Sequence, residues 1–551
     1  MRAKSRFALA GACALAVSFL SGCDPDGKPA VSLQQARQIT AEFQGQGFRP
    51  PPRTISDIAA ILDQQKPDPA KVAAAVAKAD APEPANQKGA DLAAFLYQRG
   101  LAAGELGRTL QRRNDIKRAY ELAQAPGSGV SAQLTTRYLE QLGLAEQFAG
   151  NLRTALELRQ KVAESSGGGQ RIASLSQIVN AAVPLGDLAL ARQQIPKMES
   201  ALNEIRNNPR APQWVAANSE GFLRRSQATV AAEGGQYAEA ERLYRLAMQL
   251  NERNIRDEAN ITAQANLPRD NFTRIAMLNR AQLAGVLARQ GRLLEAEVEM
   301  RSALLQSLSM TGRYSSETTN IVMGLAGVIF EQGRYAESER LARVAFETLD
   351  TMKIDPASGG FARALRLIAR AQSQRDEWEA AAATYADMRT RIAGNADAMR
   401  LNFDSNAHWG MVALRAGDAQ EAVRVMTAVV ARNVERLGER NWDTAMSRAM
   451  LGAAKLRLGD VPGSLADFDA ATPILLQTSR QSDSDEEGGS AARDAQLRVV
   501  LESMMRALAA SRRPGAAEES FRLADAIRGQ GVQRALAQSS ARAAASDPAL
   551  A

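Results

Sequence analysis

The chain has 551 residues, of which 45% are apolar and only 5% are aromatic, and its formal net charge is +7. It contains no Lys/Arg-rich tract with interleaved aromatic residues, which disfavours nucleic-acid binding. Both cysteines, Cys13 and Cys23, lie near the start of the chain, so the remainder can hold neither a disulfide framework nor a Cys-ligated zinc site.

Residues 1–22 have the form of an export signal. Three basic residues precede an apolar stretch, Phe7 to Leu20, that is too short to remain comfortably as a membrane-spanning helix. The stretch leads into Leu20-Ser21-Gly22-Cys23, which resembles the bacterial lipobox. The resemblance implies that Cys23 is acylated and becomes the new N-terminus. An ordinary cleaved signal followed by a chance cysteine is the alternative.

The lipobox resemblance also implies a location. A lipid on Cys23 would anchor an exported protein to the bacterial cell envelope, on the periplasmic side. Asp24 resembles the signal for inner-membrane retention in enteric bacteria, which slightly favours the inner membrane.

Residues 23–90 are predicted to form a tether and short N-terminal helices. Residues 24–31 contain Pro, Gly and charged residues, as a flexible tether does. Short helices are predicted over Leu33–Gln44, Ile55–Gln64 and Ala70–Lys78, with proline-rich breaks at residues 50–52 and 81–84.

From Asp91 the sequence becomes periodic. Residues 283–297 and 325–339 align without a gap at an offset of 42 residues. A turn residue ends the first half of each unit, and the period predicts eight clear repeats and two weaker ones at the ends. The predicted turn residues are Gly107, Gly150, Gly186, Gly235, Gly291, Gly333, Asp376, Gly417, Gly459 and Arg512.

Each unit has the pattern of a helical hairpin. Apolar and small residues recur at helical spacing, and a glycine then lets the backbone leave the first helix with a positive φ. An alanine five residues after the glycine would let the two helices approach closely. These alanines are Ala155, Ala191, Ala240, Ala296 and Ala422. A single hairpin cannot bury its own apolar face, so the pattern predicts an all-α solenoid of stacked hairpins.

Residues 91–525 resemble the tetratricopeptide repeat (TPR) family. The 42-residue period is longer than the usual 34 residues and is similar to the long-helix variant of kinesin light chains. The resemblance implies a right-handed superhelix whose concave groove binds a protein or peptide. An unrelated helical bundle is the alternative. Between the last two repeats, residues 481–489 contain four acidic groups and are predicted to form a mobile loop.

The sequence offers no constellation for catalysis. His408 is the single histidine, so no pair of histidines can bind a metal, and no phosphate-binding glycine loop of the Walker type occurs. His408 lies within a predicted helix without a nucleophile motif beside it, which favours a packing or groove role. We therefore expect no enzymatic activity, no cofactor and no metal.

The C-terminal stretch carries a second resemblance. Residues 520–536 look like the junction between the TPR region and the caspase-like domain of CHAT-domain proteins, and residues 97–102 look like the first repeat of that family. In that family the catalytic His and Cys lie in the downstream domain, and no residue here matches them. The resemblance implies a C-terminal helical junction at 526–551. It also supplies the alternative function, a recruiting or regulatory part of a CHAT-type cysteine peptidase.

The first helix of each TPR hairpin lines the concave face, so inward positions can be counted back from each turn residue. This count predicts a basic groove that binds an acidic or C-terminal-carboxylate peptide. The predicted groove residues are Arg225, Gln282, Arg289, Asn320, Arg363, Arg366, Arg370, His408, Arg415 and Arg457. The same positions give only three acids, Glu233, Glu331 and Asp404. The alternative is that several arginines pair with neighbouring acids and merely stabilise the stack.

Overall fold

The computed structural model describes residues 51–52, 54–64, 69–265, 267–482 and 491–528. The chain divides into two units, Met1–Lys66 and Pro67–Ala551. All regular elements among the described residues are helices, and no strand occurs among them, which confirms the all-α class. The lipobox with Cys23, the predicted helix Leu33–Gln44 and the acidic residues 483–490 lie outside the described residues.

Two of the predicted short helices are present. In the first unit Ser56–Gln64 forms α2, and in the second unit Pro69–Ala79 forms α3. The end of α3 is tied to the repeat array, because the side-chain amide of Gln111 donates to the carbonyl oxygen of Ala79 at 2.6 Å.

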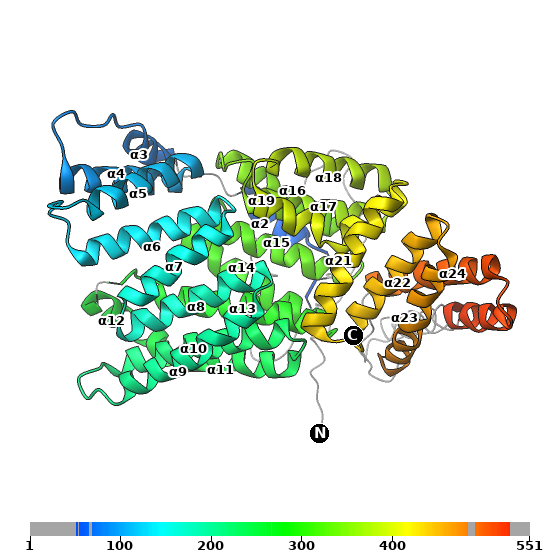
Figure 1. Cartoon of the computed structure of the whole chain (residues 1–551). Helices are drawn as coiled ribbons and strands as arrows, with labels where there is room; N and C mark the ends of the chain where they lie inside the picture. The colour runs from blue at the N-terminus through cyan, green and yellow to red at the C-terminus, as the bar shows by residue number, and fades with distance from the viewer. Residues whose placement is uncertain (1–50, 53, 65–68, 266, 483–490, 529–551) are drawn as a thin grey trace, which may run out of the picture. The chain divides into compact units, whose positions relative to one another are not determined.

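The second unit is a solenoid of helical hairpins, in which each helix packs against its neighbours in sequence (Figure 1). The hairpins are α4 (Gly89–Glu105) with α5 (Thr109–Gln124), α6 (Ala132–Phe148) with α7 (Leu152–Ser165), α8 (Gly168–Leu185) with α9 (Leu188–Arg206), α10 (Gln213–Glu233) with α11 (Tyr237–Arg256), α13 (Asn271–Arg289) with α14 (Leu293–Thr311), α15 (Ser316–Glu331) with α16 (Tyr335–Thr351), α17 (Gly359–Gln374) with α18 (Trp378–Ile392), α20 (Ala407–Arg415) with α21 (Ala419–Leu437), and α22 (Trp442–Arg457) with α23 (Val461–Ser482). A last helix, α24 (Ala491–Ser511), is followed by helical residues 516–528.

The ten predicted turn residues all have a positive φ, including the non-glycines Asp376 (61°) and Arg512 (52°). At Gly333 (80°) the next amide, of Arg334, donates back to the carbonyl oxygen of Ile329 at 3.2 Å, which is the bond that closes a helix C-terminus. The turn prediction is therefore confirmed. The five alanines predicted to let the helices approach are fully buried.

Consecutive hairpins are joined by a recurring ion pair that the sequence analysis missed. A glutamate six residues after one turn pairs with an arginine beside the next turn. The pairs are Glu241 with Arg292 at 2.7 Å, Glu297 with Arg334 at 3.0 Å, and Glu339 with Arg375 at 2.6 Å. Glu297 is fully buried and also pairs at 2.8 Å with the buried Arg301. Each pair links the second helix of one hairpin to the turn of the following hairpin.

Two insertions interrupt the regular period. A helix α12 (Glu258–Ala265) precedes α13, and its Glu258 carboxylate accepts from the amides of Phe272 at 2.5 Å and Thr273 at 3.2 Å. This carboxylate satisfies amides at the start of α13. The second insertion is α19 (Ala396–Met399), which continues as a five-residue π-helix, η2 (Arg400–Asp404).

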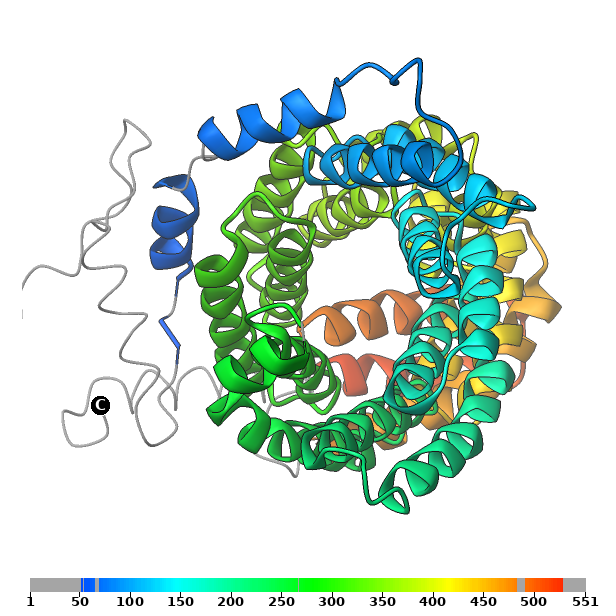
Figure 2. The same cartoon turned by 90° about the vertical axis from the view of Figure 1, so that its left-hand side faces the viewer.

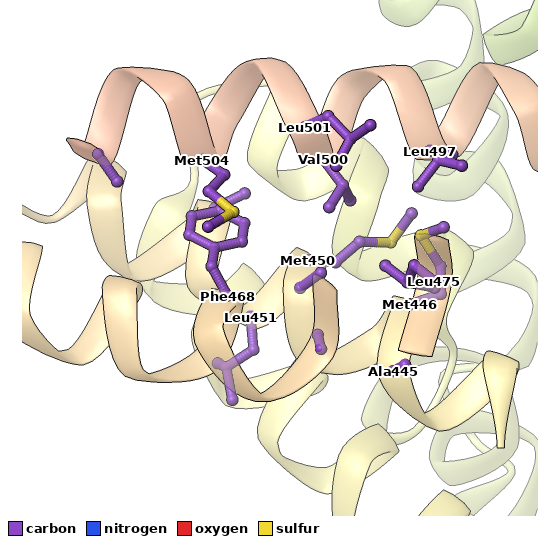
Figure 3. Packing of buried hydrophobic residues seen from close by; sticks show 14 of the residues in the cluster. Ala445, Met446, Met450, Leu451, Phe468, Leu475, Leu497, Val500, Leu501 and Met504 are labelled. Carbon is purple, nitrogen blue, oxygen red and sulfur yellow. The ribbon is translucent and has the colours of Figure 1, made fainter. Parts of the chain in front are cut away.

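The C-terminal hairpins share one apolar core. In Figure 3, Val500 and Met504 of α24 face Met450 of α22 and Phe468 of α23. Each of these side chains is at most 6% exposed. The predicted loop at 481–489 is shortened at its start, because α23 continues to Ser482. The CHAT-like junction at 526–551 is described only to Arg528 and stays a prediction.

The solenoid of the second unit returns onto itself. In Figure 2 its hairpins follow one another around a ring, with the yellow and orange C-terminal helices behind the cyan ones. Contacts between residues that lie about five hairpins apart in the chain confirm this path. Arg153 pairs with Asp397 at 3.3 Å, Asn395 donates to the carbonyl oxygen of Ala149 at 3.1 Å, and Arg436 pairs with Glu233 at 2.6 Å. We call these contacts, with Gly107 against Met352, the inter-turn seam.

Gly107→Ala is expected to destabilise the protein more than Gly291→Ala. Both glycines have a positive φ, 72° and 86°, so alanine at either position costs about 1–2 kcal/mol of backbone strain. At Gly107 the added methyl group would also overlap the carbonyl oxygen of Met352 across the seam, whereas nothing lies within 4 Å at Gly291. The overlap adds about 1–3 kcal/mol. Urea unfolding of both variants would measure the difference, and equal losses would contradict the seam contact.

Candidate functional site

The second unit encloses a cavity of about 1860 Å³. This volume exceeds the roughly 300–1,000 Å³ of ordinary small-molecule pockets and suits a longer, extended ligand. One wall consists of first helices of consecutive hairpins, α13, α15 and α17. Across from them, the lining includes Gln147 of α6, Gln177 of α8 and Asp443 of α22. Residues far apart in the chain therefore meet at one site because the solenoid returns onto itself.

Six of the ten predicted groove residues line this cavity: Gln282, Arg289, Asn320, Arg363, Arg366 and Arg370. They all lie on α13, α15 or α17, as expected if the first helix of each hairpin faces inward. Whether they contact a partner stays a prediction.

Arg363, Arg366 and Arg370 form a stripe along α17. Their spacing of three and four residues places them on one face of the helix. Arg363 donates to Asn320 Oδ1 at 3.4 Å, and Arg366 donates to Asn402 Oδ1 at 3.1 Å. Arg370 differs, because it pairs with Glu331 at 3.1 Å. The two arginines at the start of the stripe thus have only neutral amide partners.

The cavity environment opposes the charge on these two side chains. Burial, followed by repulsion from Arg366, lowers the pKa of Arg363 to about 10. Burial also lowers the pKa of Arg366. Both groups still carry a positive charge at neutral pH. Among the described residues, no carboxylate lies within 4 Å of either guanidinium, so both can accept an anionic partner.

Arg289 of α13 provides a third cation on the cavity wall. Burial alone would lower the pKa of Arg289, but the nearby carboxylates of Asp443 and Glu331 raise it above its usual range. None of the described carboxylates pairs with Arg289 within 4 Å. Asp443 belongs to a hairpin more than 150 residues away in sequence, so this balance is set by the tertiary structure.

The other four predicted groove residues lie outside the cavity lining. Arg225 is buried and donates to Ser176 Oγ at 3.1 Å, and Arg415 lies 5.0 Å from the centre of the Trp378 ring. Arg457 is exposed at the end of α22. The cavity is lined by only part of the array, so counting inward positions does not by itself identify which residues reach it.

His408 packs against Tyr385 and Ser373. Its Nδ1 lies 2.8 Å from the hydroxyl of Tyr385, and its Nε2 lies 2.7 Å from Ser373 Oγ. Burial, together with the charges of Arg370 and Arg366, lowers the pKa of His408 well below its ordinary value of 6.5. The ring is therefore neutral in the folded protein, and both ring nitrogens are occupied by hydroxyl partners.

This depressed pKa predicts a loss of stability in mild acid. Above pH 6.5 His408 is neutral in both states, and below it only the unfolded chain takes up the proton. The free energy of unfolding should then fall by up to about 1.4 kcal/mol per pH unit until the folded pKa is reached. Urea titrations between pH 7 and 5 would measure the slope. His408→Gln should remove this component, and an unchanged slope in that variant would rule out His408 as its source.

Counting inward positions in the sequence did not identify all the charged residues that line the cavity. The lining also contains Arg269, Arg274 and Arg292, and the acids Glu105, Asp270, Glu317 and Asp443.

Of the predicted acids, only Glu331 lines the cavity. Glu233 pairs with Arg436 in the seam, and Asp404 pairs with Arg424. The lining thus holds seven arginines and five acids, a weaker excess than the predicted seven to three. Several arginines are neutralised, for example Arg274 by Glu317 at 2.8 Å.

The described part of the chain contains no group of three or more His, Cys, Asp or Glu residues that could hold a metal ion. No helix there has both the length and the apolar character needed to cross a bilayer.

Comparison with known proteins gives only distant structural likenesses. No protein-family model and no curated protein sequence matches the chain. Among solved structures, it is similar to BtubC from P. vanneervenii at 16% identity and a TM-score of 0.25, covering 52% of this chain and 92% of that one. It is also similar to the apo form of RapI at 10% identity and a TM-score of 0.34, covering 71% and 99%.

Proposed function

We propose that this protein is a helical-repeat scaffold that holds a protein or peptide partner in its cavity and catalyses no reaction itself. The observation that carries this proposal is the pair Arg363 and Arg366, two charged side chains on the cavity wall whose hydrogen-bond partners are neutral amides. Both side chains are only partly exposed, and a charge that has lost part of its contact with water is stabilised by an anionic partner. A partner that supplies carboxylates would stabilise both groups.

The chemistry of the wall favours an acidic partner. A guanidinium group can grip a carboxylate with two parallel hydrogen bonds, which a side chain or a chain terminus can both accept. The amides of Gln282 and Asn320, on the same wall, can donate to and accept from a peptide backbone. The proposed ligand is therefore an extended peptide segment with acidic side chains or a free C-terminal carboxylate.

Binding of a fluorescein-labelled octaglutamate peptide, followed by fluorescence anisotropy, would test this function. We expect saturable binding that weakens as salt concentration rises, because the cavity charges would be screened. Octaglutamine and octalysine serve as matched controls and should bind much more weakly. If octaglutamate does not bind, or if octaglutamine binds equally well, the proposed acidic ligand is wrong.

We also propose that a lipid on Cys23 tethers this scaffold to the cell envelope. The basis is the Leu20-Ser21-Gly22-Cys23 sequence. In that case Cys23→Ala should abolish acylation and release the protein from the membrane fraction. Fractionation after a high-salt wash would show the change, and loss of metabolic fatty-acid labelling would confirm its cause. A variant that still sediments with membranes after the wash would contradict the lipid anchor.

A further inference from the structure

We propose that ligand binding at Arg366 is coupled to opening of the inter-turn seam. This inference rests on the proposed function, because it concerns how a ligand in the same cavity is admitted and retained. A short chain of hydrogen bonds joins the cavity wall to the seam, and its middle portion is an irregular helical segment.

The hydrogen-bond chain runs through two asparagines. In the cavity, Arg366 Nη1 donates to Asn402 Oδ1 at 3.1 Å, and Asn402 Nδ2 donates to the carbonyl oxygen of Ala398 at 2.8 Å. The amide of Ala398 donates to Asn395 Oδ1 at 2.9 Å, and Asn395 Nδ2 donates across the seam to the carbonyl oxygen of Ala149 at 3.1 Å. Four bonds therefore connect the arginine stripe to the other side of the seam.

These bonds hold a segment that can rearrange locally. They span α19 and η2, and π-helical turns are frequent at functional sites. Asn395 and Asn402 are both buried, at 7% and 5% exposure, so neither amide can readily replace a lost partner with water. A change in the partner of Asn402 must therefore be accommodated by movement of this segment.

The seam that this segment closes is mainly polar. Besides the Asn395–Ala149 bond, Arg153 contacts Asp397 through both its backbone amide and its Nε, each at 3.3 Å. Arg436 pairs with Glu233 at 2.6 Å. Partly exposed ion pairs contribute little to stability. Such a seam can open reversibly without exposing a large apolar surface.

The direction of the coupling follows from competition for Arg366. A ligand carboxylate is a stronger acceptor than the amide oxygen of Asn402 and would take the guanidinium from it. Asn402 would then lose one of the two bonds that fix its side chain, and the α19–η2 segment would hold Asn395 and Asp397 less firmly against the seam. By linkage, a protein whose seam is already weakened must bind the ligand more tightly.

Hydrogen–deuterium exchange of the full chain with and without octaglutamate would test the coupling. We expect saturating octaglutamate to speed exchange of the amides at 149–153 and 395–404 at least about fivefold, the lower end of typical couplings. The amide of Arg153 is a direct reporter, because it donates across the seam. In Asn402→Ala, octaglutamate should still bind but should no longer speed this exchange. Unchanged exchange in wild-type protein that does bind octaglutamate would overturn the coupling and leave the proposed function intact.

A surface variant provides a second test that does not depend on replacing a buried residue. Arg153 is 67% exposed, so Arg153→Ala should fold and weaken only the seam. It should tighten octaglutamate binding by up to about fivefold, the most that a surface ion pair can contribute. Arg242→Ala, which breaks the exposed Arg242–Glu239 pair, is the matched control and should leave affinity unchanged. Equal affinities of both variants and the wild type would overturn the coupling, whereas absence of binding in all three would instead refute the proposed function.

Discussion

Replacing Arg363 and Arg366 together with glutamate is expected to weaken octaglutamate binding by at least about 100-fold, since losing a charge-assisted contact costs about 1.5–3 kcal/mol for each arginine. The reversed charges would also repel the ligand carboxylates. Folding should be retained, because both positions are partly exposed on the cavity wall, where water can solvate the new carboxylates. Anisotropy titration at constant salt measures the loss directly.

The control for this variant must change the net charge equally without touching the cavity. Arg242→Glu with Arg253→Glu meets this need, because both arginines are exposed on α11 and neither lines the cavity. This control should reduce affinity only slightly, through long-range attraction that salt screens. Recovery of a native partner from cell extract should follow the same order. If both double variants lose affinity equally, the wall has no specific role.

Glu297→Ala is expected to lower the free energy of unfolding by about 3–5 kcal/mol, because it removes a carboxylate that pairs with a buried charge. Glu297 and Arg301 are 0% and 1% exposed and lie 2.8 Å apart. The same carboxylate accepts from Gln332 at 2.8 Å and from Arg334 at 3.0 Å in the next hairpin. The substitution therefore removes both a buried pair and a junction between repeats. Denaturant unfolding followed by circular dichroism would measure the loss.

A neighbouring glutamate gives the contrast for this prediction. Glu337 also pairs with Arg334, but its side chain is 28% exposed and solvent can replace the lost contact. Glu337→Ala should therefore cost only about 0–1 kcal/mol. Similar unfolding midpoints for the two variants would show that burial of Glu297 does not increase the loss of unfolding free energy as predicted.

The sequence by itself determined the hairpins. A single helix–turn–helix unit requires a positive φ at its turn, as at Gly333 or Asp376, and a small residue after it, as at Ala296. These requirements are local, so they can be recognised from the residue types at those positions. The same holds for the inward face of α17, because helical periodicity places Arg363 and Arg366 on one side wherever that helix lies. Local geometry is thus readable from spacing alone, without knowing how the repeats stack.

Only the tertiary structure decided where the array meets itself. The path of a solenoid follows from small rotations added at each repeat, and no single repeat encodes their sum. The insertions α12 and α19–η2 alter that sum further. This is why Asp443 lies near Arg289 and why Glu233 joins the seam and not the cavity. The electrostatic environment of Arg289 depends on these long-range contacts, whereas the neutral partners of Arg363 and Arg366 come from elements that neighbour α17 in the array.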